Sequence, residues 1–75
     1  MNHRVLTTGY VRDEYVQQFR YCYEVAGEWE KDWWTQVIND VWEGEAEQHC
    51  WYFRDENVAL LFKVFSGGIL LKVIK

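Results

Sequence analysis

The sequence predicts a single small α+β domain over residues 1–75, in which one amphipathic helix packs on an antiparallel or mixed sheet. The length of 75 residues suits one domain, and five Trp, five Tyr and four Phe are available for its core. Apolar residues recur at helical spacing in the middle of the chain. Short runs rich in β-branched and aromatic residues lie on either side. The predicted order is β-β-α-β-β-β, with β-α-α-β-β-β as the alternative.

Residues 4–26 fit two different structures. From Phe19 to Val25, large apolar side chains alternate with other residues, which predicts two strands, 4–11 and 15–25, joined by a turn. The same segment also has apolar residues at helical spacing, so a helix over 10–24 is the alternative.

A short repeat favours the two strands. The stretches YVRDEYV and YFRDENV share the triplet Arg-Asp-Glu, at residues 12–14 and 54–56. The second copy is expected to lie in a turn between strands, because Asp stabilises turns through its side chain and charged residues keep a loop in water. The first copy is therefore predicted to be the same kind of turn.

Residues 29–43 are predicted to form the helix. Gly27 and Gly44 flank this segment, at positions where helices commonly begin and end. Trp29 and Trp42 fall on the two rims between an apolar face and an acidic face. The apolar face repeats at spacings of three and four residues and consists of Trp33, Trp34, Val37, Ile38 and Val41.

The C-terminal part is predicted to be a three-stranded antiparallel meander. Its strands are 49–53, 58–65 and 69–74, all rich in β-branched and aromatic residues. Gly67-Gly68 suits the two-residue turn of a hairpin, because both residues can take a positive φ.

The predicted order is similar in outline to the β-grasp arrangement. The alternative order resembles ribosome-dependent messenger-RNA-cleaving toxins, and the stretch CWYFRDENVALLFKVF looks like a strand pair of that family. Those toxins are basic and use cationic catalytic side chains, whereas this chain has a net charge of −4. No function is therefore carried over from the resemblance.

No pattern of catalysis or metal binding is found in the sequence. His49 and Cys50 are neighbours that would point to opposite faces of a strand, and no Cys-x-x-Cys spacing or phosphate-binding loop occurs. We therefore predict no enzymatic activity, no cofactor and no metal. No apolar run approaches the roughly 20 residues of a membrane span, and no signal peptide is found, so we expect a cytoplasmic protein without a membrane partner.

The charge distribution leads to the functional prediction. From Glu28 to Glu47 there are seven carboxylates and one cation, a formal charge of −6 within a chain of net charge −4. An acidic helix face attracts basic proteins, and Trp is enriched at the centre of interfaces. The predicted partner-binding residues are Glu28, Trp29, Asp32, Asp40, Trp42 and Glu43.

We therefore expect a non-catalytic inhibitor or regulator that blocks a basic, nucleic-acid-handling protein. Phage anti-defence, immunity and antitoxin proteins work in this way. One alternative is a structural subunit or homodimer formed through the edge strand from Ile69 to Lys75. The other is a single-strand nucleic-acid-binding module, although the net charge of −4 argues against direct nucleic-acid binding.

Overall fold

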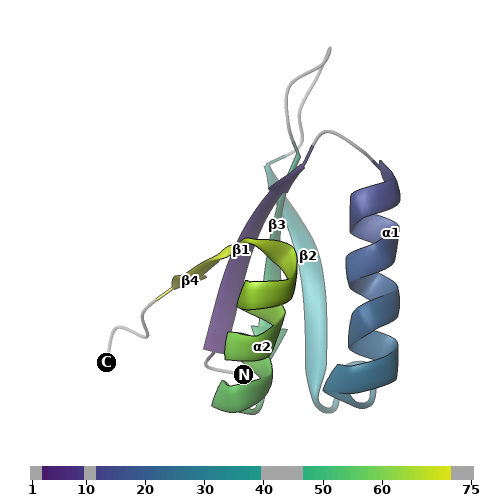
Figure 1. Cartoon of the computed structure of the whole chain (residues 1–75), viewed down its shortest axis with the longest axis vertical. Coiled ribbons are helices and arrows are strands. Elements are labelled where there is room, and N and C mark those ends of the chain that lie inside the picture. Colours follow the sequence, from purple (N-terminus) through teal and green to yellow (C-terminus); the bar gives the residue numbers. More distant parts are fainter. Residues whose placement is uncertain (1–2, 10–11, 40–46, 72–75) are drawn as a thin grey trace.

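The structure, a computed structural model, describes residues 3–9, 12–39 and 47–71. It confirms the α+β class: two helices lie against a four-stranded antiparallel sheet (Figure 1). The first helix continues into a short π-helix, η1. In chain order the elements are β1 (His3–Gly9), α1 (Arg12–Tyr21), η1 (Cys22–Ala26), β2 (Trp33–Asn39), β3 (Glu47–Phe53), α2 (Glu56–Ser66) and β4 (Ile69–Leu71).

The strands are arranged in the order β2-β3-β1-β4, and every neighbouring pair is antiparallel. Across the sheet, Val5 of β1 lies opposite Trp51 of β3, and His3 and Trp33 both lie opposite Phe53. This connectivity is the split βαβ, or ferredoxin-like, arrangement. Many unrelated functions share it, so the topology assigns none to this chain.

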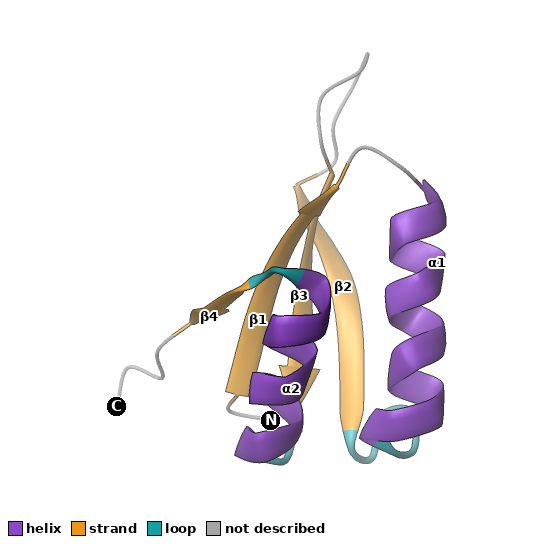
Figure 2. Ribbon diagram, in the orientation of Figure 1, coloured by secondary structure: helices purple, strands orange, loops and turns teal. Residues whose placement is uncertain are grey.

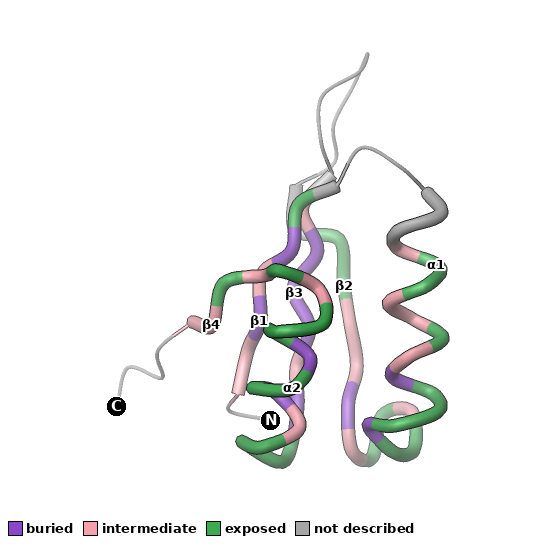
Figure 3. The backbone as a smooth tube through the Cα atoms, in the orientation of Figure 1, coloured by how far each residue is buried: buried purple, intermediate pink, exposed green. Residues whose placement is uncertain are grey.

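Both helices cover the same face of the sheet (Figure 2), and the core lies between the helices and this face. Trp51 is fully buried at its centre, 4.8 Å from the ring of Phe62 and 5.6 Å from that of Tyr15. The buried positions follow the sheet-facing side of α2 (Figure 3) and alternate along β1, whereas His49, Cys50 and Trp51 are buried in succession along β3. The core cluster consists of Val5, Cys22, Ala26, Trp33, Trp51, Phe53, Ala59 and Phe62.

The predicted helix over 29–43 is wrong, because residues 33–39 form strand β2. Apolar residues at 33, 34, 37 and 38 satisfy a helical period, but Trp33 and Trp34 here point to opposite faces of a sheet. Trp, Thr and Val favour a strand once a neighbouring strand is present. Glu30 has a φ of 67°, which lies outside the right-handed helical region. Residues 27–32 therefore form a loop that leads into β2.

The predicted strand 58–65 is also wrong, because Glu56–Ser66 forms helix α2. Asp55 is its N-cap, and the Asp55 side chain accepts a hydrogen bond from the Asn57 amide at 2.8 Å. Gly67 ends the helix with a φ of 70°, and its amide donates to the Lys63 carbonyl at 2.9 Å. The Gly67-Gly68 pair therefore ends a helix rather than forming a hairpin turn.

The strand predicted at 49–53 is confirmed as part of β3, but its partners are β1 and β2. The strand predicted at 69–74 begins as β4, which is described to Leu71 and pairs with β1. The meander predicted for the C-terminal part is therefore wrong, because its middle strand is a helix and its two outer strands both pair with β1. The observed order is β-α-β-β-α-β, which differs from both the predicted order and its alternative.

Within residues 4–26, the strand expected at 4–11 is confirmed as β1, and the strand expected at 15–25 is wrong. Here the helical alternative is correct, because α1 and η1 together cover 12–26. The two Arg-Asp-Glu triplets do share a structural role, but it is not a turn between strands. The first begins α1 after β1, and the second leads from β3 into α2, so both lie at a strand-to-helix junction.

Candidate partner-binding site

The loop 27–32 connects η1 to β2 and is held by its own hydrogen bonds. The Asp32 carboxylate accepts from the Glu28 amide, and the Asp32 amide donates to the Glu28 carbonyl, both at 2.8 Å. Gly27 has a φ of 115°, and a Cβ there would lie 2.5 Å from Asp32 Oδ2. Only glycine therefore fits at this position, and the loop has one defined shape.

This loop forms one wall of a cleft of about 270 Å³, lined by Trp29, Glu30 and Trp34. The positive φ of Glu30 turns the chain between the two Trp positions. Among the described residues, the two salt bridges are Arg20–Glu24 and Lys31–Glu28, so neither involves Glu30. The cleft thus combines two indole rings with the Glu30 carboxylate, which forms no salt bridge with a described cation.

Other aromatic rings support both indoles from behind. Trp29 contacts Trp33 edge-on at 4.9 Å and Phe19 at 5.5 Å between ring centroids. Trp34 stacks on Tyr52 at 4.1 Å with an interplanar angle of 4°. These contacts restrict the side-chain rotamers, so a ligand would meet rings that are already positioned.

Tyr52 is in turn fixed by Gln36, whose Nε2 donates to the phenol oxygen at 2.8 Å. Burial is the first cause that raises the pKa of Tyr52 above its usual range. The phenol therefore stays neutral over the physiological range, and it accepts this hydrogen bond without adding charge beside the cleft.

Of the six residues predicted to bind a partner, the structure brings three together in this loop. Glu28 is exposed and forms an ion pair with Lys31 at 3.7 Å, whereas the Asp32 carboxylate is used inside the loop. Trp29 lines the cleft directly. The other three, Asp40, Trp42 and Glu43, lie outside the described residues.

The sequence prediction missed Glu30 and Trp34. Treating Trp33 and Trp34 as one apolar helix face concealed that adjacent strand residues point to opposite sides. Strand alternation would have separated buried Trp33 from the half-buried Trp34.

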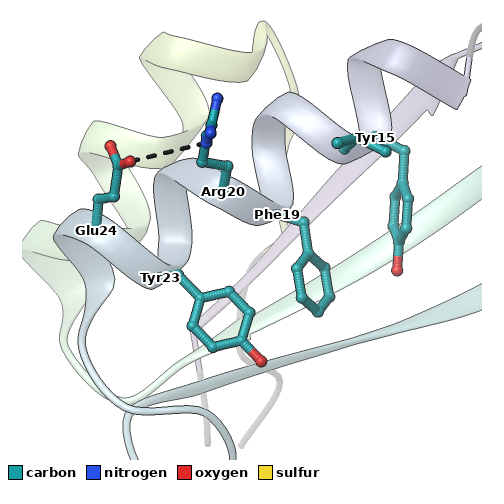
Figure 4. Close-up of a pocket in the computed structure, with 6 residues that line it drawn as sticks. Tyr15, Phe19, Arg20, Tyr23 and Glu24 are labelled. Atoms are coloured by element: carbon teal, nitrogen blue, oxygen red, sulfur yellow. Dashed lines mark ion pairs between the residues drawn. The ribbon is translucent and has the colours of Figure 1, made fainter.

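A larger hollow of about 510 Å³ runs along α1 and η1. Tyr15, Phe19 and Tyr23 project from one side of the helix, and Arg20 and Glu24 project from another, where they pair at 3.9 Å (Figure 4). The hollow is mainly apolar, because its only charged lining residues are this pair. No charged group is left there to select a ligand.

The face of the sheet opposite the helices bears a row of side chains that crosses all four strands. Trp34, Tyr52, Arg4 and Leu71 lie at directly opposed positions of β2, β3, β1 and β4. Arg4 is the one cation on this face among the strand residues whose side chains are described.

Within the part of the chain that the structure describes, no three His, Cys, Asp or Glu residues are grouped so that they could hold a metal ion. Cys22 and Cys50 are buried free thiols. None of the described helices has the length and apolar character needed to cross a membrane.

Comparisons with models of known protein families, with curated proteins and with solved structures found no match for this chain.

Proposed function

We propose that this chain is a non-catalytic protein-binding module that receives a Lys or Arg side chain of a basic partner in the Trp29–Glu30–Trp34 cleft. One observation carries the proposal: two indoles and a carboxylate line the same cleft. A cation over an indole face is attracted by roughly 0.5–1 kcal/mol at an exposed site. The Glu30 carboxylate adds a direct ionic contact with the charged group of that Lys or Arg side chain.

The charge of the whole chain supports the same kind of partner. The net charge is −4, and the loop bears Glu28, Glu30 and Asp32 against Lys31 alone. A negative field raises the rate at which a basic protein is encountered, and it disfavours acidic partners.

Proteins that handle nucleic acids expose Lys and Arg for phosphate contacts. A chain that occupies such a surface competes with the nucleic acid without needing catalysis. We therefore propose an inhibitor or regulator of the phage anti-defence, immunity or antitoxin kind, acting in the cytoplasm. The acidic helix face that first suggested this role is replaced here by the cleft and its loop.

The proposal is tested by titrating the purified protein with an oligolysine peptide and following tryptophan fluorescence. Glu30→Gln and Trp34→Ala should each weaken binding about two- to fivefold, the loss expected from one exposed cation–π or ionic contact. Oligoglutamate should not bind. Glu24→Gln is the matched control, because it removes the same charge from an exposed position on η1.

Equal weakening in Glu24→Gln and Glu30→Gln would contradict the proposal, because only overall charge would then matter. Asp32→Lys is a poor test, since it removes the carboxylate that accepts the Glu28 amide and so disturbs the loop itself. Capture from a host lysate with wild type and Glu30→Gln would then identify the partner.

Single-strand nucleic-acid binding is the second candidate, favoured by the aromatic and cationic row on the open sheet face. However, Trp34 and Tyr52 stack on each other at 4.1 Å, so each ring has only its outer face left for a base, and Arg4 is the one cation of this row that could contact phosphate. Bases bind such platforms by stacking on free ring faces. Arg4→Ala would abolish oligonucleotide binding under this alternative and would leave oligolysine binding unchanged under the first proposal.

A further inference from the structure

Helix α2 is apolar on both of its faces. Ala59 and Phe62 are buried against the sheet, as expected for an amphipathic helix. Yet on the outward side Leu60 is 40%, Leu61 57% and Val64 80% exposed. A surface helix normally turns polar residues outward, so these outward apolar side chains, which lie beside the exposed Asn57, form an apolar surface that nothing covers in the described structure.

The two rims of this outward face differ. On one rim, Phe65 stacks on Tyr21 at 4.2 Å with an interplanar angle of 10°, which closes that side. On the other rim lie Glu56 in the first turn and Lys63 in the last turn. Seven residues make almost two turns, so these opposite charges lie on one side of the helix, about 10 Å apart along its axis.

We propose that a second copy of this chain covers the outward face of α2, with the two helices antiparallel about a two-fold axis. Such an axis is perpendicular to both helices, so each rim meets the same rim of the other copy with its order reversed. Glu56 of each copy then faces Lys63 of the other. Leu60 and Leu61, which lie midway between the two charges, meet their own counterparts near the axis, and Val64 lies beyond Lys63, over the first turn of the other helix.

Charge complementarity favours a second copy over an unrelated protein. The chain has a net charge of −4, which would oppose self-association at most of its surface. At this face Glu56 and Lys63 cancel, and they are placed so that the face is complementary to itself. A basic partner would meet Lys63 and an acidic partner would meet Glu56, each as a like charge.

The area of the outward face of α2 determines the affinity that we expect for the dimer. Three or four exposed apolar side chains provide a few hundred Å², which is the size that marks an interaction site. Stable complexes bury about 800 Å² on each partner. The dimer should therefore be weak and dependent on concentration. It rests on α2 alone and is independent of the Trp29–Glu30–Trp34 cleft.

The first test is sedimentation equilibrium over a series of protein concentrations. Wild type should change from monomer to dimer, and Leu61→Lys should stay monomeric, because a charge at this exposed position beside the two-fold axis cannot be buried unpaired. Val16→Lys is the matched control, since Val16 is 53% exposed on α1 and should leave dimerisation unchanged. Circular dichroism checks that each variant is folded.

The second test is a charge exchange. Glu56→Lys and Lys63→Glu should each weaken self-association roughly four- to twenty-five-fold, because the two-fold axis makes each substitution turn two exposed ion pairs into repulsive contacts. When the two variants are mixed, both contacts become attractive again, and a heterodimer should form in preference to either homodimer. Native mass spectrometry distinguishes the three species by mass.

A wild type that stays monomeric throughout the concentration series would overturn the inference. So would a dimer that Leu61→Lys leaves intact, or a mixture without preference for the heterodimer. If Ile69→Lys rather than Leu61→Lys removed the dimer, the contact would be the β4 edge expected from the sequence, and α2 would not be the interface.

Discussion

Replacing Thr7 by valine tests the buried hydrogen bond at the centre of the core. The Trp51 indole Nε1 donates to Thr7 Oγ1 at 2.8 Å, with Trp51 fully buried and Thr7 only 4% exposed. Among the described residues, no buried side-chain nitrogen or oxygen lacks a hydrogen-bond partner. Thr7→Val would create one, because a methyl group takes the place of the acceptor.

The expected loss follows from two opposing effects. A buried donor left without an acceptor costs about 1–3 kcal/mol. The added methyl group returns up to about 0.8 kcal/mol of burial. The free energy of unfolding should therefore fall by roughly 1–2 kcal/mol, and the midpoint of thermal unfolding by about 4–8 °C for each kcal/mol in a domain of this size.

Urea unfolding followed by far-ultraviolet circular dichroism measures this change, and the m-value should stay constant. A Trp51→Phe background supplies the decisive control, because phenylalanine has no N–H to leave unpaired. There Thr7→Val should be neutral or stabilising. An equal loss of stability in both backgrounds would refute the reasoning, since the cost would then come from packing alone.

Four further predictions concern stability. Burial raises the pKa of the Cys22 thiol from 9.0 to about 12, so its contribution is complete below pH 9 and is lost as the pH rises towards 12. Urea unfolding should show a loss of about 2 kcal/mol by pH 10.5, which Cys22→Ala should lack. Asp55→Ala should lower the free energy of unfolding by about 1 kcal/mol through loss of the α2 N-cap, and Asp55→Asn should retain most of it. Gly67→Ala should cost about 1–2 kcal/mol for its left-handed φ of 70° alone, because nothing lies within 4 Å. Gly68→Ala should expose the β4 amides to hydrogen exchange, because its Cβ would lie 2.7 Å from the Leu6 carbonyl oxygen.

The fold class and three strands were predictable, because runs rich in β-branched and aromatic residues mark β1, β3 and the start of β4. Besides 15–25, two segments were assigned the wrong type of element, each for its own reason. At 33–39 the apolar residues satisfy both periods, and the choice depends on pairing with β3, which is distant in sequence. At 58–65 the β-branched and aromatic residues favoured a strand. The helix signals were the N-cap at Asp55 and the C-terminal Gly67.

The candidate site was only partly predictable. A concentration of carboxylates around Glu28 is visible in the sequence, and Trp29 was correctly placed beside it. That Asp32 is used inside the loop follows from the geometry of Gly27, which no sequence pattern expresses. The role of Trp34 depends on β2 being an edge strand, and this requires the order of the whole sheet.

The order β2-β3-β1-β4 has a consequence for how the protein is made. Every strand pair in the described sheet joins a strand from residues 3–39 to one from residues 47–71. The N-terminal half therefore leaves the ribosome with two strands that have no partner for each other, and it must wait for β3. The sheet therefore forms late in synthesis. Until then the N-terminal half exposes aromatic residues and unpaired strands, so its protection from aggregation depends on the speed of translation and on chaperones.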